Sequence, residues 1–445
     1  MKNYRYFIMG MIVFMTVINY VDRGALSYAQ QAIISEFGFD HVSWGAVLGF
    51  FGYGYLFGSI LGGMLADIKG PKFVWIIIGI GWSIFEIATA FAGEIGMMLF
   101  GGSTLAGFAV FRILFGFAEG PAFSTINRTN ANWAAPKERG FAASLGLLGS
   151  PLGALLTAPI AVGLLSITSW RMMFIILGTL GILWVIVWTK VFTDKPEDNP
   201  RVSKEELALI NSKDDLLINE KLVESNGVHT NKWYHFFKNP TLVFNAIGYF
   251  ALQYITFLFL TWTPKYLQDV YGFQLSALWY LGMIPWIGAC FTVILGGRLS
   301  DYLRRKTGNL RIARSGLAVV SLFLTAVCFV LIPFTDSVVG VMALMCIGNA
   351  FNFLPNSVYW TVILDTEPNL AGTYGGISHF ICNLATIIAP TLTGVLVINY
   401  GYPSMFIAAV VAVVIGMVAM MFVKPGQSEM YSKRSLKSPK VKPQT

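Results

Sequence analysis

Charge is scarce in this chain of 445 residues: only 12% of them are Asp, Glu, Lys or Arg, against roughly 25% in an ordinary soluble protein. Cysteine and histidine are scarce as well, with four of each. No Cys-x-x-Cys pair or histidine cluster is present, so the sequence offers neither a disulfide framework nor a zinc site. Long polar stretches are missing outside residues 194–238 and the C-terminal end. These scarcities exclude an ordinary soluble protein.

Apolar residues make up 55% of the chain, and apolar runs of about 20 residues, enough to cross a bilayer core, recur from Tyr6 to Val423. The first run follows Lys2 and Arg5 without a convincing cleavage site, so we interpret it as a retained helix and not a signal peptide. We expect an all-α integral membrane protein of twelve transmembrane helices. The predicted spans are 6–28, 44–66, 72–92, 98–124, 139–164, 170–192, 239–264, 276–299, 312–333, 338–363, 371–397 and 402–423.

An internal repeat divides the chain in two. Gly63-Met-Leu-Ala-Asp67 after the second span is echoed by Gly297-Arg-Leu-Ser-Asp301 after the eighth. We therefore predict two six-helix halves, residues 1–193 and 239–424, with a linker at 194–238 and a basic tail at 425–445. Two parallel halves around a midplane site are a transporter architecture. In the linker, Ser203-Lys-Glu-Glu206 resembles a capping box and predicts a short amphipathic helix.

The net charge of +8 follows the predicted topology. Basic residues gather in the loops on one side and in the tail, whereas the opposite loops are mostly acidic, with Arg171 and Lys265 as exceptions. The positive-inside rule then puts both termini and the linker in the cytoplasm. The expected partners are therefore the lipid bilayer, with anionic lipid near the tail, and no nucleic acid.

Ionisable side chains inside predicted spans usually face a cavity and serve transport. Asp22 and Arg23 are adjacent in the first span, so they project about 100° apart and need not neutralise each other. Arg23 could then hold a substrate carboxylate in bidentate fashion while Asp22 binds and releases a proton. A structural ion pair near a helix end is the alternative.

The fourth span carries Arg112 and Glu119, which share one helix face about 10 Å apart along the axis. Glu119 could exchange a proton in the same cavity, unless the two residues form a network that only ties this span to a neighbour. Glu86 lies midway along the third span with no partner nearby in sequence, and the sequence assigns it no role.

The second half offers polar groups that would suit substrate hydroxyls. His379 and Asn383 share a helix face, and a hydrogen bond between helices explains them equally well. Asp365, at the end of the tenth span, is expected to be solvated. The full set of polar candidates is Gln253, Tyr254, Asn349, Asn352, Asn356, Ser357, Trp360, His379 and Asn383. No metal-ligand spacing, nucleophile elbow or Walker loop is present, so we expect no enzyme, no catalytic residue and no metal.

Five segments together resemble the anion:cation symporter branch of the major facilitator superfamily over nearly the whole chain, and within it the bacterial proton symporters for galactonate, glucarate and hexuronates. They are Tyr20-Val-Asp22-Arg23, Gly63-x-x-x-Asp67-x-x-Gly70, Arg112-x-x-x-Gly116-x-x-Glu119-Gly-Pro-Ala-Phe123, Trp133-x-x-Pro136-x-Glu138-Arg139-Gly140 and Leu260-Thr-Trp262-x-Pro264-x-Tyr266-Leu. The resemblance implies the major facilitator fold.

The resemblance also implies roles for individual residues. Asp22 and Glu119 would carry protons, and Arg23 would bind the substrate carboxylate. The remaining implied pocket residues are Tyr20, Tyr55, Arg112, Ser357 and Trp360, with Asp67 and Arg139 as cytoplasmic gating contacts. Two positions depart from galactonate-type relatives, which have Gln in place of Ser150 and Asn in place of His379. We count both as substrate-binding candidates, and they leave the particular sugar acid open.

The sequence thus predicts proton symport of a small organic anion by alternating access. The expected cargo is a sugar acid of the hexonate, hexarate or hexuronate class. The carrier is expected to work as a monomer in the cell membrane, without a cofactor beyond the coupling protons. The alternative is an anion exchanger or facilitator on the same fold, in which neither Asp22 nor Glu119 needs to change protonation.

Overall fold

The computed structural model describes residues 3–135, 139–211, 233–367 and 370–426. Regular structure within these ranges is entirely helical. The first helices are α1 (Tyr4–Tyr28), α2 (Gln30–Phe37), α3 (His41–Lys69), α4 (Pro71–Thr89), α5 (Ala92–Leu99), α6 (Thr104–Glu119), α7 (Ala122–Trp133), α8 (Arg139–Ile167), α9 (Trp170–Val191), η2 (Pro196–Asp198) and α10 (Lys204–Ile210). The others are η3 (Trp233–Lys238), α12 (Pro240–Tyr271), α13 (Leu275–Leu281), α14 (Ile284–Thr307), η4 (Ile312–Gly316), α15 (Leu317–Leu331), η5 (Ile332–Phe334), α16 (Val338–Phe353), α17 (Asn356–Thr366), α18 (Ala371–Asn383), α19 (Ala385–Tyr400) and α20 (Pro403–Phe422).

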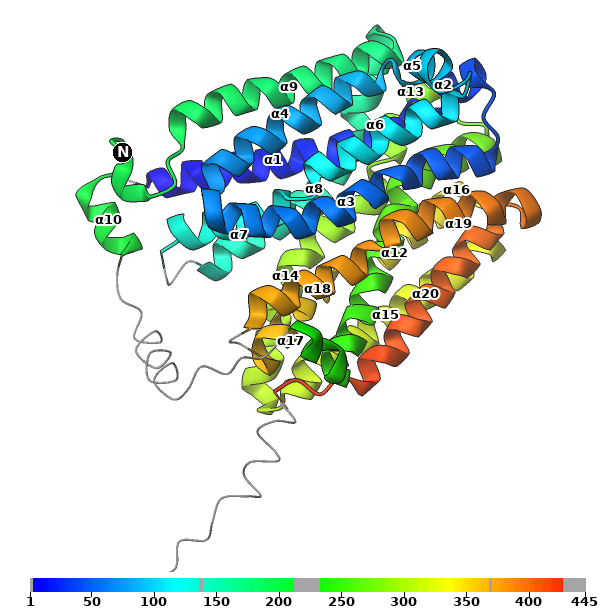
Figure 1. Ribbon diagram of the computed structural model, residues 1–445. Helices are drawn as coiled ribbons and strands as arrows, with labels where there is room; N and C mark the ends of the chain where they lie inside the picture. Colours follow the sequence, from blue (N-terminus) through cyan, green and yellow to red (C-terminus); the bar gives the residue numbers. More distant parts are fainter. Residues whose placement is uncertain (1–2, 136–138, 212–232, 368–369, 427–445) are drawn as a thin grey trace, which may run out of the picture.

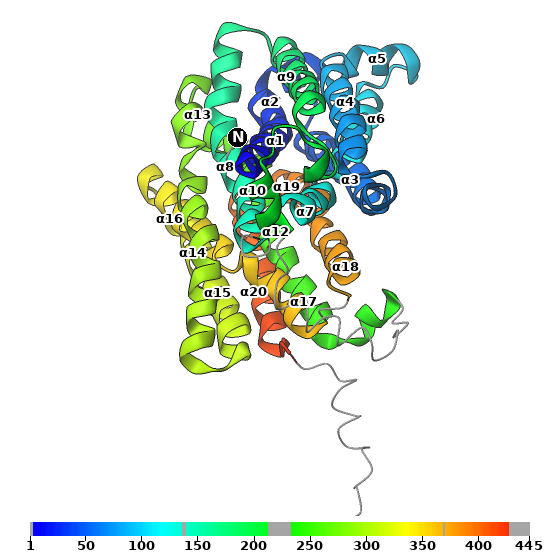
Figure 2. The same cartoon turned by 90° about the vertical axis from the view of Figure 1, so that its left-hand side faces the viewer.

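The predicted all-helical membrane architecture is confirmed. Eleven segments of the described chain are long and apolar enough to cross a bilayer, and α3 adds a further helix of 29 residues. Helices α1 to α9 gather in the upper part of Figure 1, and most of α12 to α20 lie below them. The view in Figure 2, turned by 90°, also separates most of the two groups.

The fourth span differs from its predicted range of 98–124. The chain leaves α5 at Leu99, and Gly101 and Gly102 take positive φ values of 64° and 86°, which helical residues with side chains avoid. The Ser103 hydroxyl then accepts a hydrogen bond from the Ala106 N–H at 3.2 Å and starts α6. The apolar segment therefore begins at residue 104 and continues through α7. The predicted start was wrong because Met97 to Phe100 extend the apolar run without extending the helix.

The first part of the linker, which contains α10, packs against the first half. The Ser203 hydroxyl caps α10 at the predicted position by accepting from the Glu206 N–H. The Glu206 carboxylate accepts hydrogen bonds from the backbone N–H groups of Tyr4 and Arg5, both at 2.9 Å, and from the Arg5 guanidinium at 3.1 Å. An anion at a helix N-terminus satisfies free N–H groups and the helix dipole. This carboxylate therefore fastens the linker helix to α1.

The two groups of helices touch at the end of the bundle that lies away from the N-terminus of α1. The Ser27 hydroxyl donates to the Leu260 carbonyl at 2.8 Å, and the Gln30 amide donates to the Gln268 side chain at 3.0 Å. Helices α3 and α19 also approach closely, since a Cβ at Gly45 would lie only 2.8 Å from the Pro390 carbonyl oxygen. These contacts close that end of the space between the halves.

Candidate functional site

Arg23 and Glu119 form a buried ion pair. The Arg23 Nε donates to Glu119 Oε1 at 2.9 Å, and the two side chains are 2% and 1% exposed. The bond joins α1 to α6 across 96 residues of sequence. Arg23 Nη2 and Glu119 Oε2 have no hydrogen-bond partner. Arg23 Nε and Glu119 Oε1 are therefore occupied by their mutual hydrogen bond, while Arg23 Nη2 can still donate to another acceptor.

Aromatic rings surround the Arg23 guanidinium. Its central carbon lies 4.9 Å from the Tyr20 ring centroid, 4.6 Å from that of Tyr55 and 5.0 Å from that of Phe51. A fourth ring, Phe257 of α12, lies 6.0 Å away and belongs to the other group of helices. Each such contact in a desolvated site contributes about 0.5–2 kcal/mol. The rings therefore hold this cation at the boundary between the halves.

A second aromatic group centres on His379 of α18. The imidazole centroid lies 6.0 Å from Trp360 and 6.4 Å from Tyr249, both in the second half. It also lies 5.8 Å from Phe123 and 6.4 Å from Tyr55, both in the first half. Tyr55 contacts both groups and so joins the Arg23 pair to His379.

Hydrogen bonds between helices account for several polar side chains of the second half. The Asn383 side-chain oxygen accepts from the Gln253 amide of α12 at 3.3 Å, while the Asn383 NH2 group donates to the His379 carbonyl of its own helix at 2.7 Å. The Asn349 amide donates to the Pro285 carbonyl, and that of Asn352 to the Leu252 carbonyl. These amides tie helices together, which is the structural alternative for Asn383.

The other predicted site residues are more dispersed. Ser150 of α8 is buried beside the Tyr20 hydroxyl. Ser357 directs its hydroxyl toward α14, where a Cβ at Gly297 would lie 3.3 Å from it. The side chains of Asp67 and Arg139 lie outside the described residues.

Asp22, Glu86 and Arg112 are buried charges beside the Arg23 pair. Each is at most 2% exposed. Neither carboxylate has a hydrogen-bond partner, and Arg112 lacks one at Nε and Nη1. All three interact electrostatically with one another and with Glu119. The whole cluster therefore combines three carboxyl groups with two guanidinium groups.

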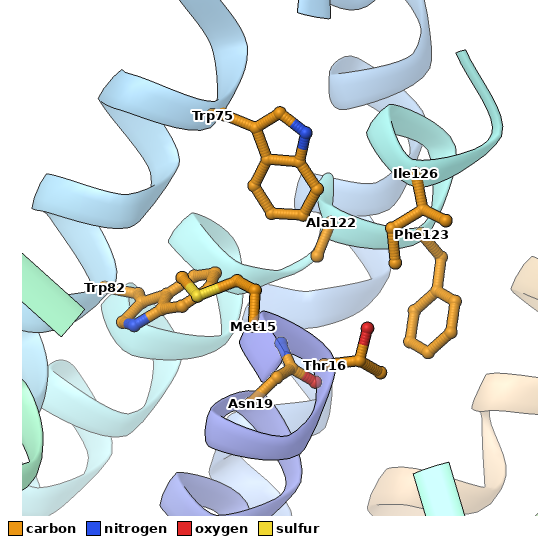
Figure 3. Close-up of a pocket in the computed structure, with 8 residues that line it drawn as sticks. All are labelled: Met15, Thr16, Asn19, Trp75, Trp82, Ala122, Phe123 and Ile126. Carbon is orange, nitrogen blue, oxygen red and sulfur yellow. The ribbon is translucent and has the colours of Figure 1, made fainter. Parts of the chain in front are cut away.

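A narrow pocket lies inside the first half, between α1, α4 and α7 (Figure 3). Asn19 of α1 and Trp82 of α4 border the pocket, and the Asn19 amide and the Trp82 indole N–H have no hydrogen-bond partner. The lining residues are Met15, Thr16, Asn19, Trp75, Trp82, Ala122, Phe123 and Ile126. The described residues contain no group of three His, Cys, Asp or Glu side chains that could hold a metal ion.

Sequence reasoning missed one buried ion pair in the second half. Arg314 donates to Asp365 Oδ2 at 3.0 Å and to Asp301 Oδ1 at 3.1 Å. Asp365 was expected to be solvated, but its side chain is only 16% exposed. The expectation was wrong because its partner lies 51 residues away, on the preceding span, where no local pattern reveals it.

The two basic exceptions to the loop pattern both have acidic partners. Arg171 pairs with Glu36 and Glu94 at the closed end of the bundle, and Lys265 pairs with Asp269 at 2.8 Å. Hydrogen bonds from the Arg171 guanidinium lower the pKa of Glu36 below its usual value. Both basic side chains are thus paired with acidic side chains close by.

Comparisons with known proteins support this reading of the fold. The family model described as Major Facilitator Superfamily matches residues 12–390. A hexuronate transporter of Bacillus subtilis is 32% identical, with 92% of each chain covered. A probable sulfoacetate transporter of Cupriavidus necator is 30% identical, with 95% of this chain and 94% of that one covered. The crystal structure of a bacterial homologue of the human lysosomal transporter Spinster, inward-facing and unoccupied, has a TM-score of 0.73 at 17% identity and covers 95% of this chain and 97% of its own.

Proposed function

This chain belongs to the major facilitator superfamily and is a membrane transporter, not an enzyme, and from that premise we propose that it imports a sugar acid by proton symport. The observation that carries the proposal is the buried Arg23–Glu119 pair, in which the guanidinium keeps an unpartnered Nη2. A planar guanidinium is suited to a carboxylate, which it can bind through two parallel hydrogen bonds. Arg23 is accordingly the residue that captures the substrate carboxylate.

Proton coupling follows from competition at Arg23. A bound substrate carboxylate and an ionised Glu119 would both face one guanidinium, about 5 Å apart, and their repulsion amounts to about 3 kcal/mol at an effective dielectric constant of 20. Protonating Glu119 removes this repulsion. The carrier therefore binds anion and proton together and releases them together.

The proposed cycle uses both predicted acids. In the outward-facing carrier Asp22 and Glu119 are protonated and Arg23 captures the anion. The halves then rock, the substrate leaves, and Glu119 returns to Arg23 in the pairing seen here. The proposed substrate contacts are Tyr20, Tyr55, Arg112, Ser150, Ser357, Trp360 and His379, and the proposed gating contacts are Asp67 and Arg139.

The orientation completes the proposal. With both termini in the cytoplasm of a bacterial plasma membrane, the closed end formed by Ser27, Gln30 and Gly45 faces outward. The contacts between the halves then correspond to an inward-facing carrier. We propose that it functions as a monomer, with protons as coupling ions and no other cofactor.

The aromatic lining favours a sugar acid as cargo. The rings around His379 and Arg23 offer flat apolar faces of the kind that pack against a carbon skeleton, beside a cation for the carboxylate. The hexuronate relative agrees with a hexonate, hexarate or hexuronate cargo. Another relative is named as a probable sulfoacetate transporter, and sulfoacetate is a smaller acid, so it belongs in any test panel.

Thermal stabilisation of the purified protein tests the cargo. The panel contains D-glucuronate, D-galactonate, D-glucarate, sulfoacetate and neutral glucose, and the best compound goes into uptake assays driven by a pH gradient in proteoliposomes. Stabilisation by one sugar acid and uptake that rises with inward proton gradient are expected. Uptake indifferent to the gradient would instead indicate an exchanger or facilitator, and stabilisation by sulfoacetate alone would overturn the sugar-acid assignment.

A further inference from the structure

A polar cavity of about 320 Å³ lies at the closed end of the bundle, and neither Arg23 nor Glu119 lines it. Helix α2 of the first half forms one wall, and the last turns of α12 with the residues that follow them form the other. Four glutamines contribute to these walls, namely Gln30, Gln31, Gln268 and Gln274. A cavity of this size falls in the range that encloses a small molecule. The transport cycle proposed above has no use for it.

The glutamine side chains form a chain of hydrogen bonds between the two halves. Gln30 Nε2 donates to Gln268 Oε1 at 3.0 Å, and Gln268 Nε2 donates to Gln31 Oε1 at 3.5 Å. Gln30 is 1% exposed, yet its own Oε1 has no hydrogen-bond partner. A buried carbonyl oxygen without a donor is unfavourable. This wall is therefore suited to a ligand that donates a hydrogen bond.

The charges at the cavity select against a further anion. Among the described lining residues Lys265 is the cation, and its Nζ already lies 2.8 Å from Asp269 Oδ2. Asp269 also accepts from the Tyr402 hydroxyl. Helix α12 ends at Tyr271, so its partly negative C-terminus lies at the same wall. A carboxylate cannot donate to Gln30 Oε1 and would be repelled here, whereas hydroxyl groups can both donate to that oxygen and accept from amide N–H groups.

We propose that this cavity is a second binding site, separate from the central anion site, and that it takes a neutral polyhydroxy compound such as a hexose or a sugar alcohol. Its amide groups offer donors and acceptors to several hydroxyls. Ile34 and Phe273 also line the cavity and provide apolar surface for the C–H groups of a sugar ring. The ligand of this site is therefore not the cargo.

The site couples its ligand to the conformation of the carrier. Because α2 and α12 belong to different halves, the cavity exists only while the halves meet at this end. A ligand that binds one conformation alone shifts the population toward it. At about nine times its dissociation constant, it raises the ratio of closed to open carrier about tenfold. Binding itself does not depend on the proposed function, whereas inhibition of transport rests on the alternating access proposed above.

Saturation-transfer NMR of the purified, substrate-free protein with D-glucose tests the site. The wild type should transfer saturation to glucose at millimolar concentration. Ser35→Trp places a large ring at the cavity wall, and Gln30→Met removes the acceptor at similar side-chain length, so both should lose the signal. Ser166→Trp should keep it. Ser166 is the matched control, because both serines are exposed and donate to the carbonyl three residues earlier, at 2.9 Å for Ser35 and 2.7 Å for Ser166, but only Ser35 lines the cavity.

Maleimide labelling of Ser27→Cys tests the coupling to closure. Ser27 is 0% exposed, and its hydroxyl donates to the Leu260 carbonyl of the other half, so a cysteine there reacts when this end opens. Labelling of residue 27, followed by peptide mass spectrometry, should slow about tenfold with glucose at about nine times its dissociation constant. Adding Ser35→Trp to Ser27→Cys should remove this effect of glucose.

Several results would overturn the inference. The absence of a glucose signal in the wild type would refute the site, and equal signals in the wild type, Ser35→Trp and Gln30→Met would place the sugar elsewhere. Bound glucose that leaves labelling unchanged would refute the coupling to closure. If Gln30→Met does not fold, Ser35→Trp against Ser166→Trp still decides. Glucose lacks the carboxylate that Arg23 is proposed to hold, so these outcomes are separate from failure of the symport proposal, which appears as uptake indifferent to pH.

Discussion

Glu119→Gln provides the sharpest test of how anion and proton are coupled. In the structure Glu119 Oε1 accepts from Arg23 Nε at 2.9 Å, and both side chains are buried. Glutamine keeps the shape and the accepting oxygen but removes the charge that competes with the substrate carboxylate. The variant therefore imitates the protonated carrier at every pH.

The expected effect can be worked from Coulomb's law. Two carboxylates about 5 Å apart on one guanidinium repel by about 3 kcal/mol at an effective dielectric constant of 20, which corresponds to roughly 200-fold in affinity. Glu119→Gln should accordingly bind D-glucuronate, or whichever acid proves best, about 100- to 200-fold more tightly than the wild type at pH 9. At acid pH, where wild-type Glu119 is protonated, the difference should shrink.

Isothermal calorimetric titration of the protein with substrate from pH 5 to pH 9 measures this change in affinity. Asp336→Asn is the control variant, because it removes one acid outside the site. Transport adds a second readout: proton-driven accumulation should be lost in Glu119→Gln, while counterflow of labelled substrate survives. If Glu119→Gln lost substrate binding and counterflow together, the proposed competition between Glu119 and the substrate would be refuted. The ion pair would then have only a structural role. An unchanged pH dependence of affinity would remove Glu119 from coupling.

Three further outcomes are expected. Arg23→Ala should weaken substrate binding far more than Arg23→Lys, because lysine keeps the charge and loses only the bidentate geometry; equal affinity in both variants and the wild type would exclude Arg23 from the substrate site. Arg171 lowers the pKa of Glu36 from 4.5, so the stabilisation is fully present above 4.5 and is lost as pH falls through the folded-state pKa. The gap in melting temperature between wild type and Glu36→Gln should therefore shrink as the pH is lowered from 4.5 and close below the folded-state pKa; a gap that stays constant with pH would contradict this. Gly45→Leu should block the approach of α3 to Pro390, abolish uptake and increase maleimide labelling of Ser27→Cys, whereas Gly163→Leu, where a Cβ meets nothing within 4 Å, should transport normally; normal uptake in Gly45→Leu would mean that closure tolerates a wider contact.

The fold was largely predictable because bilayer crossing requires long apolar runs, and such runs are visible without coordinates. Helix ends were less predictable. At Gly101 to Ser103 the hydropathy continues while the backbone turns, so only turn chemistry marks the start of α6. Breaks such as that between α16 and α17, at Leu354 and Pro355, likewise fall inside one apolar run.

The charged residues of the site could be singled out because charges inside apolar spans are rare, but their pairing could not. Arg23 was adjacent to Asp22 and Glu119 shared a helix face with Arg112, yet the observed bond joins Arg23 to Glu119. That choice depends on how α1 crosses α6, which is set by packing between distant segments. The pairing of Arg314 with Asp365 in the second half could not be predicted from the sequence for the same reason.

The rings around His379 make the chemical shift of its imidazole protons sensitive to the conformation of the carrier. Phe123 and Tyr55 belong to one half, whereas Trp360 and Tyr249 belong to the other. Ring currents from the first two change when the halves separate, while those from the last two persist. The chain has only four histidines, and His41 lies against Trp262 and Tyr402 of the other half at the closed end. The intensities of the imidazole resonances of His379 and His41 would thus report the fractions of inward- and outward-facing carrier without an added label.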